Sequence, residues 1–237
     1  RGLASAYGLD FVPGSWMESI QVSKGAASVT NGYESLTGQI NLQYKKPATT
    51  ERLFLNGFAS SSGRYESNAN GYLNVGEKWK TAFLGHASTD SRENDHNDDG
   101  FLDEPLTTRY TFLNRWEYKA NDHLSTQFGV KVLQEERTGG QKQYNRHLDP
   151  FSQEAYGIAI DSRNVEAFFK TGYIFPEDDM KSIALVANFT HHNQESVFGR
   201  RLYNGTQNYF LGNLIFMSHF GDSENHKYTT GVTWLYD

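Results

Sequence analysis

An acidic stretch of the chain carries oxygen-bearing side chains at the spacing of a calcium-binding loop. The candidate ligands are the side chains of Asp95, Asn97, Asp99 and Asp103 and the backbone carbonyl of Phe101. Gly100 stands where such a loop turns sharply, but Leu106 occupies the position of the glutamate that normally completes the coordination. The sequence predicts Ca²⁺ in the 95–103 loop, ahead of Mg²⁺. The alternative is a solvated acidic loop rich in turn-forming residues.

Other polar and aromatic residues lie in segments between strand-like stretches and are candidates for ligand recognition. They are Tyr144, Arg146 and His147 in the segment 137–161, His192 at a strand end, and Arg200 and Arg201 in the following loop. For each of them, an ordinary exposed loop residue is the alternative. The neighbours His191 and His192 cannot form one chelate, because adjacent strand residues point to opposite faces. The sequence shows no nucleophile constellation, phosphate loop or nucleic-acid patch, so we predict neither an enzyme nor a nucleic-acid partner.

The segments that would position these residues have the pattern of β-strands. From Arg52 onward, about nine strand-like stretches follow one another, at roughly 51–60, 67–76, 79–90, 108–119, 123–136, 162–174, 181–193, 207–220 and 226–237. In the fourth of these, Tyr110, Phe112 and Trp116 alternate with Arg109 and Arg115. Each strand is therefore expected to have one apolar and one polar face.

The connections between these stretches are expected to alternate between shorter and longer. Aromatic residues such as Trp79, Trp116 and Tyr118 lie beside the short turns. Short turns at one end, long loops at the other and an aromatic girdle are typical of an outer-membrane β-barrel. The alternative is a soluble β-sandwich, in which alternation also occurs but the apolar face is buried.

Composition narrows the class without deciding the function. The chain has 237 residues, 14% of them aromatic, and contains 5 Pro, which favours strands over helices. The mean hydropathy is −0.66. Together with the absence of a long apolar run, this excludes a transmembrane helix. A net charge of −6 argues against a nucleic-acid partner, and the absence of Cys decides little.

The segment before Pro47 resembles the C-terminal half of the plug domain in TonB-dependent outer-membrane receptors. The matching positions are Lys24, Gly25, Ser28, Gly32, Gly38, Ile40 and Asn41, at the spacing found in that family. The amino-acid sequence of residues 31–41 most resembles that of receptors of Bacteroidetes type. Ala26 and Gln21 depart from the family, which often has Pro and an acid at these positions. Independently of the family, the glycines mark places where the chain turns sharply or passes close to other backbone.

The resemblance implies an all-β fold, with the C-terminal part of a plug domain at 1–47 and the first part of a transmembrane antiparallel up-and-down barrel at 48–237. Such barrels have about 22 strands, so we expect a piece of a longer protein, preceded by the segment that binds TonB. The implied activity is TonB-coupled uptake of a metal chelate, cobalamin or glycan through the bacterial outer membrane. A surface lipoprotein is a further candidate partner, and the segment around Tyr33 would contact the ligand.

Two rival functions remain open at this stage. A soluble β-sandwich for binding or adhesion would bury the face that carries Phe112, Phe128 and Phe169. An outer-membrane barrel hydrolase would need catalytic residues at its outer rim, where His191 and Asp161 could be imagined, although nothing in their spacing supports such a site.

Overall fold

The computed structural model describes residues 3, 8–25, 38–221 and 226–237, and these residues form an all-β structure. A short 3-10 helix, η2 (Gly14–Trp16), precedes two sheets. The strands are β1 (Met17–Lys24), β2 (Gly38–Tyr44), β3 (Leu53–Ala59), β4 (Arg64–Val75), β5 (Trp79–Asp90), β6 (Leu106–Lys119), β7 (Leu124–Gly140), β8 (Gly157–Phe175), β9 (Asp178–Phe198), β10 (Arg201–Leu202), β11 (Gly205–His219) and β12 (Lys227–Tyr236). No helix in the described residues has the length and apolarity needed to cross a membrane.

The large sheet is an antiparallel meander in which the strands pair in sequence order, except that β11 pairs with β9 and not with β10. Its order is β12-β11-β9-β8-β7-β6-β5-β4-β3, with β10 paired to β9. The nine predicted strands are therefore confirmed, and β10 is an addition. Within the described residues the sheet does not close on itself, so β3 and β12 are open edges.

The pairing register places the apolar residues of neighbouring strands side by side on one face. Phe112 pairs with Val132, and Val132 pairs with Val165. On the opposite face, Leu113 pairs with Lys131, which pairs with Glu166. The predicted division into an apolar and a polar face is confirmed, because strand side chains alternate with a period of two.

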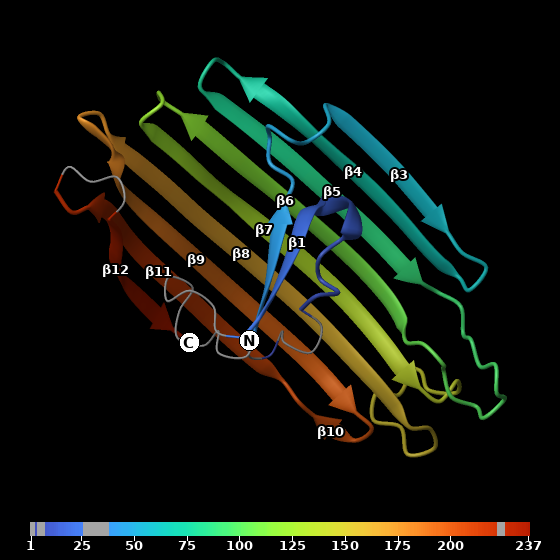
Figure 1. The fold of residues 1–237 in the computed structure, drawn as a ribbon. Helices are drawn as coiled ribbons and strands as arrows, with labels where there is room; N and C mark the ends of the chain where they lie inside the picture. The colour runs from blue at the N-terminus through green and yellow to red at the C-terminus, as the bar shows by residue number, and fades with distance from the viewer. Residues whose placement is uncertain (1–2, 4–7, 26–37, 222–225) are drawn as a thin grey trace.

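The longest connections, 91–105 and 141–156, lie at one end of the sheet, at the lower right in Figure 1. The short turns 76–78, 120–123 and 176–177 lie at the other end. The expected strict alternation of lengths is wrong for the last pair, since the connections 199–204 and 220–226 are of similar length. The reason is that β9 continues to Phe198 and adds a small hairpin with β10.

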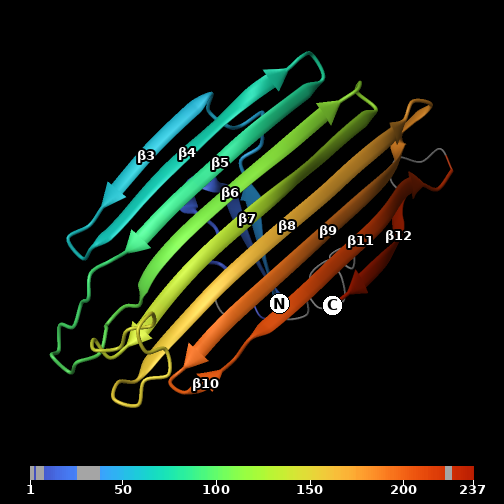
Figure 2. The ribbon, with the colours of Figure 1, turned by 180° about the vertical axis from the view of Figure 1, so that it is seen from behind.

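The N-terminal segment, defined here as residues 8–25 and 38–47, crosses one face of the large sheet. The β1–β2 hairpin stands in front of the sheet in Figure 1 and behind it in Figure 2. The covered face is the polar one, because Arg109 and Arg115 on this face donate to backbone carbonyls of the segment. The apolar face is left uncovered by the described residues, and Phe112 is 43% exposed and Phe169 39% exposed there.

Candidate functional site

Trp16 anchors the N-terminal segment to the polar face. Its side chain is completely buried against Leu84 of β5 and Leu113 of β6, with Tyr44 and Phe168 packed around this cluster. The Tyr44 ring meets the indole edge to face, with centroids 6.3 Å apart. The polar face thus contains an apolar socket, and this socket receives the only tryptophan in the sequence of the segment.

A pair of cations from β6 and β7 holds the end of β2. Arg115 donates from Nη1 to the carbonyls of Tyr44 and Lys45, at 3.2 and 3.0 Å, and from Nη2 to Gln127 Oε1 at 3.1 Å. Lys131 pairs with Glu166 at 2.7 Å and lies near the Tyr44 ring. Burial raises the pKa of the Tyr44 phenol above its usual value, although Lys131 opposes this effect. Tyr44 therefore stays neutral and can donate a hydrogen bond.

A buried charge network holds the start of the N-terminal segment. Glu135, only 1% exposed, accepts from Arg109 Nε at 2.6 Å and pairs with Arg137 at 3.1 Å. Arg109 also donates to the Asp10 carbonyl, and Arg137 lies 3.6 Å from the Asp10 carboxylate. The segment is thus held mainly by cations that reach its backbone.

Two cavities of about 500 Å³ each flank these contacts. One lies toward the long connections and is bounded by residues 9–14 together with Arg64, Asp90, Glu104, Arg109 and Arg137. The other lies toward the short turns, between β2 and the strands β6 to β9. Both open onto the polar face, so they are lined mostly by groups that bind polar ligands.

The candidate calcium loop folds around the side chain of Asp95. The Asp95 carboxylate accepts from the backbone N–H groups of Asp99 and Gly100, both at 3.1 Å. Gly100 adopts φ +81°, in agreement with the predicted sharp turn. Hydrogen bonds from His96 hold the pKa of the Asp103 carboxyl below its usual value. In the described residues no three His, Asp or Glu come together as a metal-holding group, so Ca²⁺ in this loop stays a prediction.

Calcium titration of the purified protein tests this loop. We expect a dissociation constant on the order of 0.1–1 mM, the range of extracellular calcium modules. Asp99→Asn should weaken binding at least about tenfold, because a formal negative charge is lost from the ligand set. Asp149→Asn, at an exposed acid of the neighbouring long connection, is the control and should leave the affinity unchanged. If calorimetry detects no heat of Ca²⁺ binding to the unaltered protein, the prediction is contradicted.

The predicted ligand-recognition residues are not gathered into one site. Tyr144 is buried, and its hydroxyl donates to the Pro150 carbonyl, so it stabilises its own loop. Arg146 pairs with Asp161, whereas His147 is exposed. Arg200 and Arg201 are exposed and line a hollow of about 550 Å³ beside residues 152–156.

His192 lies within β9 and is almost fully buried on the polar face, with its ring near Phe11. His191 is on the opposite face and hydrogen-bonds Asn208, which agrees with the expected divergence of the two rings. His192 is therefore part of the face that the N-terminal segment covers, rather than of an exposed loop.

The residues that carry the family resemblance lie on the β1–β2 hairpin as far as they are described. Lys24 pairs with Gly38, and Val22 with Ile40, while Asn41 donates to Gln21 at 3.3 Å. Gly25 has φ +83° and Gly38 φ +151°, and a Cβ on Gly38 would stand 2.9 Å from the Ser23 carbonyl. These two glycines thus have the conformational reason predicted for them. Ser28, Gly32 and Tyr33 lie outside the described residues.

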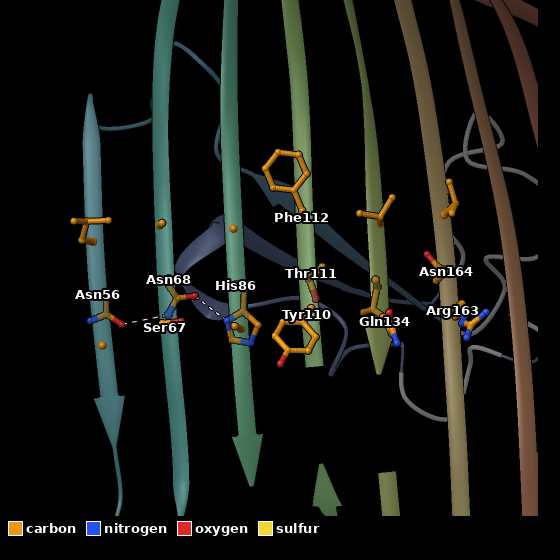
Figure 3. Close-up of a pocket in the computed structure, with 18 residues that line it drawn as sticks. Asn56, Ser67, Asn68, His86, Tyr110, Thr111, Phe112, Gln134, Arg163 and Asn164 are labelled. Carbon is orange, nitrogen blue, oxygen red and sulfur yellow. Dashed lines mark hydrogen bonds between the residues drawn. The ribbon is translucent and has the colours of Figure 1, made fainter. Parts of the chain in front are cut away.

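A groove of about 850 Å³ crosses the opposite, apolar face of the sheet. Figure 3 shows Tyr110 and Phe112 on β6 beside it, with Gln134 on β7 and Arg163 on β8. The groove exists because β3, β4 and β5 contribute small residues here, namely Gly57, Ser67, Ala69, Gly85 and Ala87. Its lining suits an apolar occupant.

Three residues central to the polar-face contacts were not among the predicted site residues: Asp10, Trp16 and Glu135. Glu135 could have been found, because its strand alternation places it on the same face as Lys131.

Comparison of the chain with protein-family models, with curated proteins and with solved structures finds no match.

Proposed function

We propose that this chain is part of an outer-membrane transporter of the TonB-dependent type, in which residues 48–237 form wall strands and residues 1–47 belong to the plug. The observation that carries the proposal is the assignment of the two faces. The polar face holds the N-terminal segment, and the apolar face is exposed. Water disfavours a broad exposed apolar surface, whereas in a bilayer the apolar face contacts lipid and the polar face lines the lumen.

The open edges of the sheet fit the same proposal. Unpaired backbone N–H and C=O groups on β3 and β12 are not tolerated in hydrocarbon, so a membrane sheet must close. In the proposed protein, further strands pair with both edges and complete the barrel. The short turns then face the periplasm, and the connections 91–105 and 141–156 face outward.

The contacts of the N-terminal segment suit a plug that has to move. Apart from the Trp16 socket and the buried ring of Phe11, many of these contacts are polar, among them the hydrogen bonds that Arg109 and Arg115 make to backbone carbonyls. Such contacts can be exchanged for water when a channel opens. In the proposed mechanism, force applied through TonB moves this segment off the polar face, and a scarce nutrient bound from outside passes through.

The rival functions lack a comparable observation. A soluble β-sandwich would bury the face of Phe112 and Phe169, which is exposed here. For a barrel hydrolase, His191 is hydrogen-bonded to Asn208, and Asp161 is paired with Arg146. These contacts place the two residues in separate interactions, so no catalytic pair supports that function.

Single cysteines test the face assignment, since the chain has no cysteine of its own. In native outer membranes, Val132→Cys on the apolar face should react with a lipid-soluble maleimide and be protected from a charged one. Leu148→Cys, in a long connection where Leu148 is 84% exposed, is the control and should react with the charged reagent on intact cells. Recovery of the protein in the soluble fraction, with Val132→Cys freely reactive toward the charged reagent, would overturn the proposal.

A further inference from the structure

The cavity toward the short turns carries more positive than negative charge. Its charged lining consists of Lys46, Arg115, Lys131, Lys170 and Glu166. Among the described residues, four cations therefore face one carboxylate around about 500 Å³ of space. Neutral polar residues, including Tyr44, Gln127 and Asn188, and apolar residues such as Leu113 and Phe168 complete the wall.

The single carboxylate of the lining is already engaged. Glu166 lies 2.7 Å from Lys131, whose side chain is 5% exposed, so this pair neutralises itself. Glu117 lies just beyond the lining and accepts from Gln127 Nε2 at 3.3 Å. The remaining three cations have no carboxylate within ion-pair distance among the described residues.

Arg115 is the most informative of these cations. Its Nη groups bind the Tyr44 and Lys45 carbonyls and the Gln127 side chain, all of them neutral. Its Nε is buried and has no hydrogen-bond partner among the described residues. A buried N–H of a charged group without an acceptor is costly, so Arg115 lacks one partner.

Lys46 and Lys170 approach the same space from opposite sides. Lys46 follows β2 in the N-terminal segment, Lys170 lies on β8, and both line the cavity together with Arg115. Neither lysine forms an ion pair within the described part of the chain. Mutual repulsion of three cations is relieved most directly by an anion placed between them.

We propose that this cavity binds a small oxyanion, a phosphate or a carboxylate. Guanidinium and ammonium groups are the donors that proteins use for such ligands, and bonds between charged partners are the strong ones. The anion would accept from Arg115 and from the two lysines, with the neutral Tyr44 hydroxyl as a further donor. It would also join the end of β2 to β6 and β8, because its ligands come from all three places.

Binding of inorganic phosphate to the intact purified protein tests the site by calorimetry. Lys170 is exposed to the cavity, so Lys170→Gln should fold normally and weaken binding at least about tenfold, the loss that goes with one charge-assisted hydrogen bond. Lys119→Gln removes the same charge from the exposed Lys119–Asp122 pair outside the cavity. This control should change the affinity less than about twofold, as exposed and screened charges do.

A second variant shifts the affinity in the opposite direction. Glu166→Gln removes the only carboxylate among the described lining residues and frees Lys131, so phosphate should bind more tightly and should raise the unfolding temperature of this variant. Acetate should compete with phosphate if carboxylates share the site. The proposal is overturned if phosphate does not bind, or if Lys170→Gln and Lys119→Gln weaken binding equally.

The anion site goes beyond the proposed transport function, and the two can fail separately. Phosphate binding is measured on the purified protein, whereas the face assignment is measured in membranes. If the protein binds phosphate but is recovered in the soluble fraction, the anion site is supported and the transporter proposal is contradicted.

Discussion

Trp16→Ala is expected to release the N-terminal segment from the sheet and to lower the free energy of unfolding by about 3–5 kcal/mol, the usual cost of truncating a buried aromatic residue. The indole is completely buried between Leu84 and Leu113 and is the largest apolar contact described between the segment and the sheet. Urea titration of the intact purified protein measures the loss, and limited proteolysis reports whether residues 8–47 become accessible.

Two matched variants separate this effect from a general loss of aromatic surface. Trp234→Ala removes an indole that is 69% exposed on the apolar face, and it should leave the proteolysis pattern unchanged. Trp16→Phe keeps most of the buried surface and removes an indole N–H that has no partner among the described residues. Trp16→Phe should therefore lower the free energy of unfolding much less than Trp16→Ala does. Equal losses of stability in the two Trp16 variants would contradict the packing of this side chain in the apolar socket.

Glu135→Ala is expected to destabilise the protein by about 3–5 kcal/mol, because removing one member of a buried ion pair leaves its partner uncompensated. Glu135 is 1% exposed and contacts both Arg109 and Arg137. Without it, the buried Arg109 retains the Asp10 carbonyl but loses its carboxylate. The same urea titration measures the change.

The neighbouring residue supplies the control. Glu136 is exposed on the other face of β7, so Glu136→Ala should change stability by less than about 0.5 kcal/mol. A double variant, Glu135→Gln with Arg109→Met, should recover part of the loss, since it removes the buried charge of Arg109 together with that of Glu135, while Arg137 keeps its contact with Asp10. If Glu135→Ala and Glu136→Ala prove equally mild, the buried network does not hold the segment.

The strands could be predicted because their pattern is local. Side chains alternate with a period of two, so the sequence Tyr110, Thr111, Phe112, Leu113 already assigns residues to two faces, and the register then aligns Phe112 with Val132. The end of β9 was missed for a related reason. Residues 191–196 are polar on both faces, and their strand state comes from backbone pairing with β8 and β11 rather than from an apolar stripe.

The contacts of the polar face could be predicted only in part. The alternation of side chains places Arg115 and Lys131 on this face. It does not predict that Arg115 binds the carbonyls at the end of β2 or that Lys131 pairs with Glu166. The burial of Trp16 was not predictable either, since its socket is built by two strands far along the chain. The glycines between Lys24 and Asn41 were expected to mark sharp turns or close backbone approaches, and Gly25 and Gly38 have positive φ angles.

In the large sheet, strands that follow one another in the sequence lie side by side, and this order affects how the protein folds. Each strand from β3 to β12 adds to the strand before it, apart from β10, so the pairings of the sheet join strands that are consecutive or nearly consecutive in the sequence. Docking of the N-terminal segment is different, because Trp16 meets residues of β5 and β6, and Asp10 meets residues of β6 and β7. Those contacts close long loops and require strands that are already paired. The sheet should therefore form strand by strand before the N-terminal segment docks onto it. Hydrogen exchange during folding should show protection of β6 to β9 earlier than protection of β1 and β2.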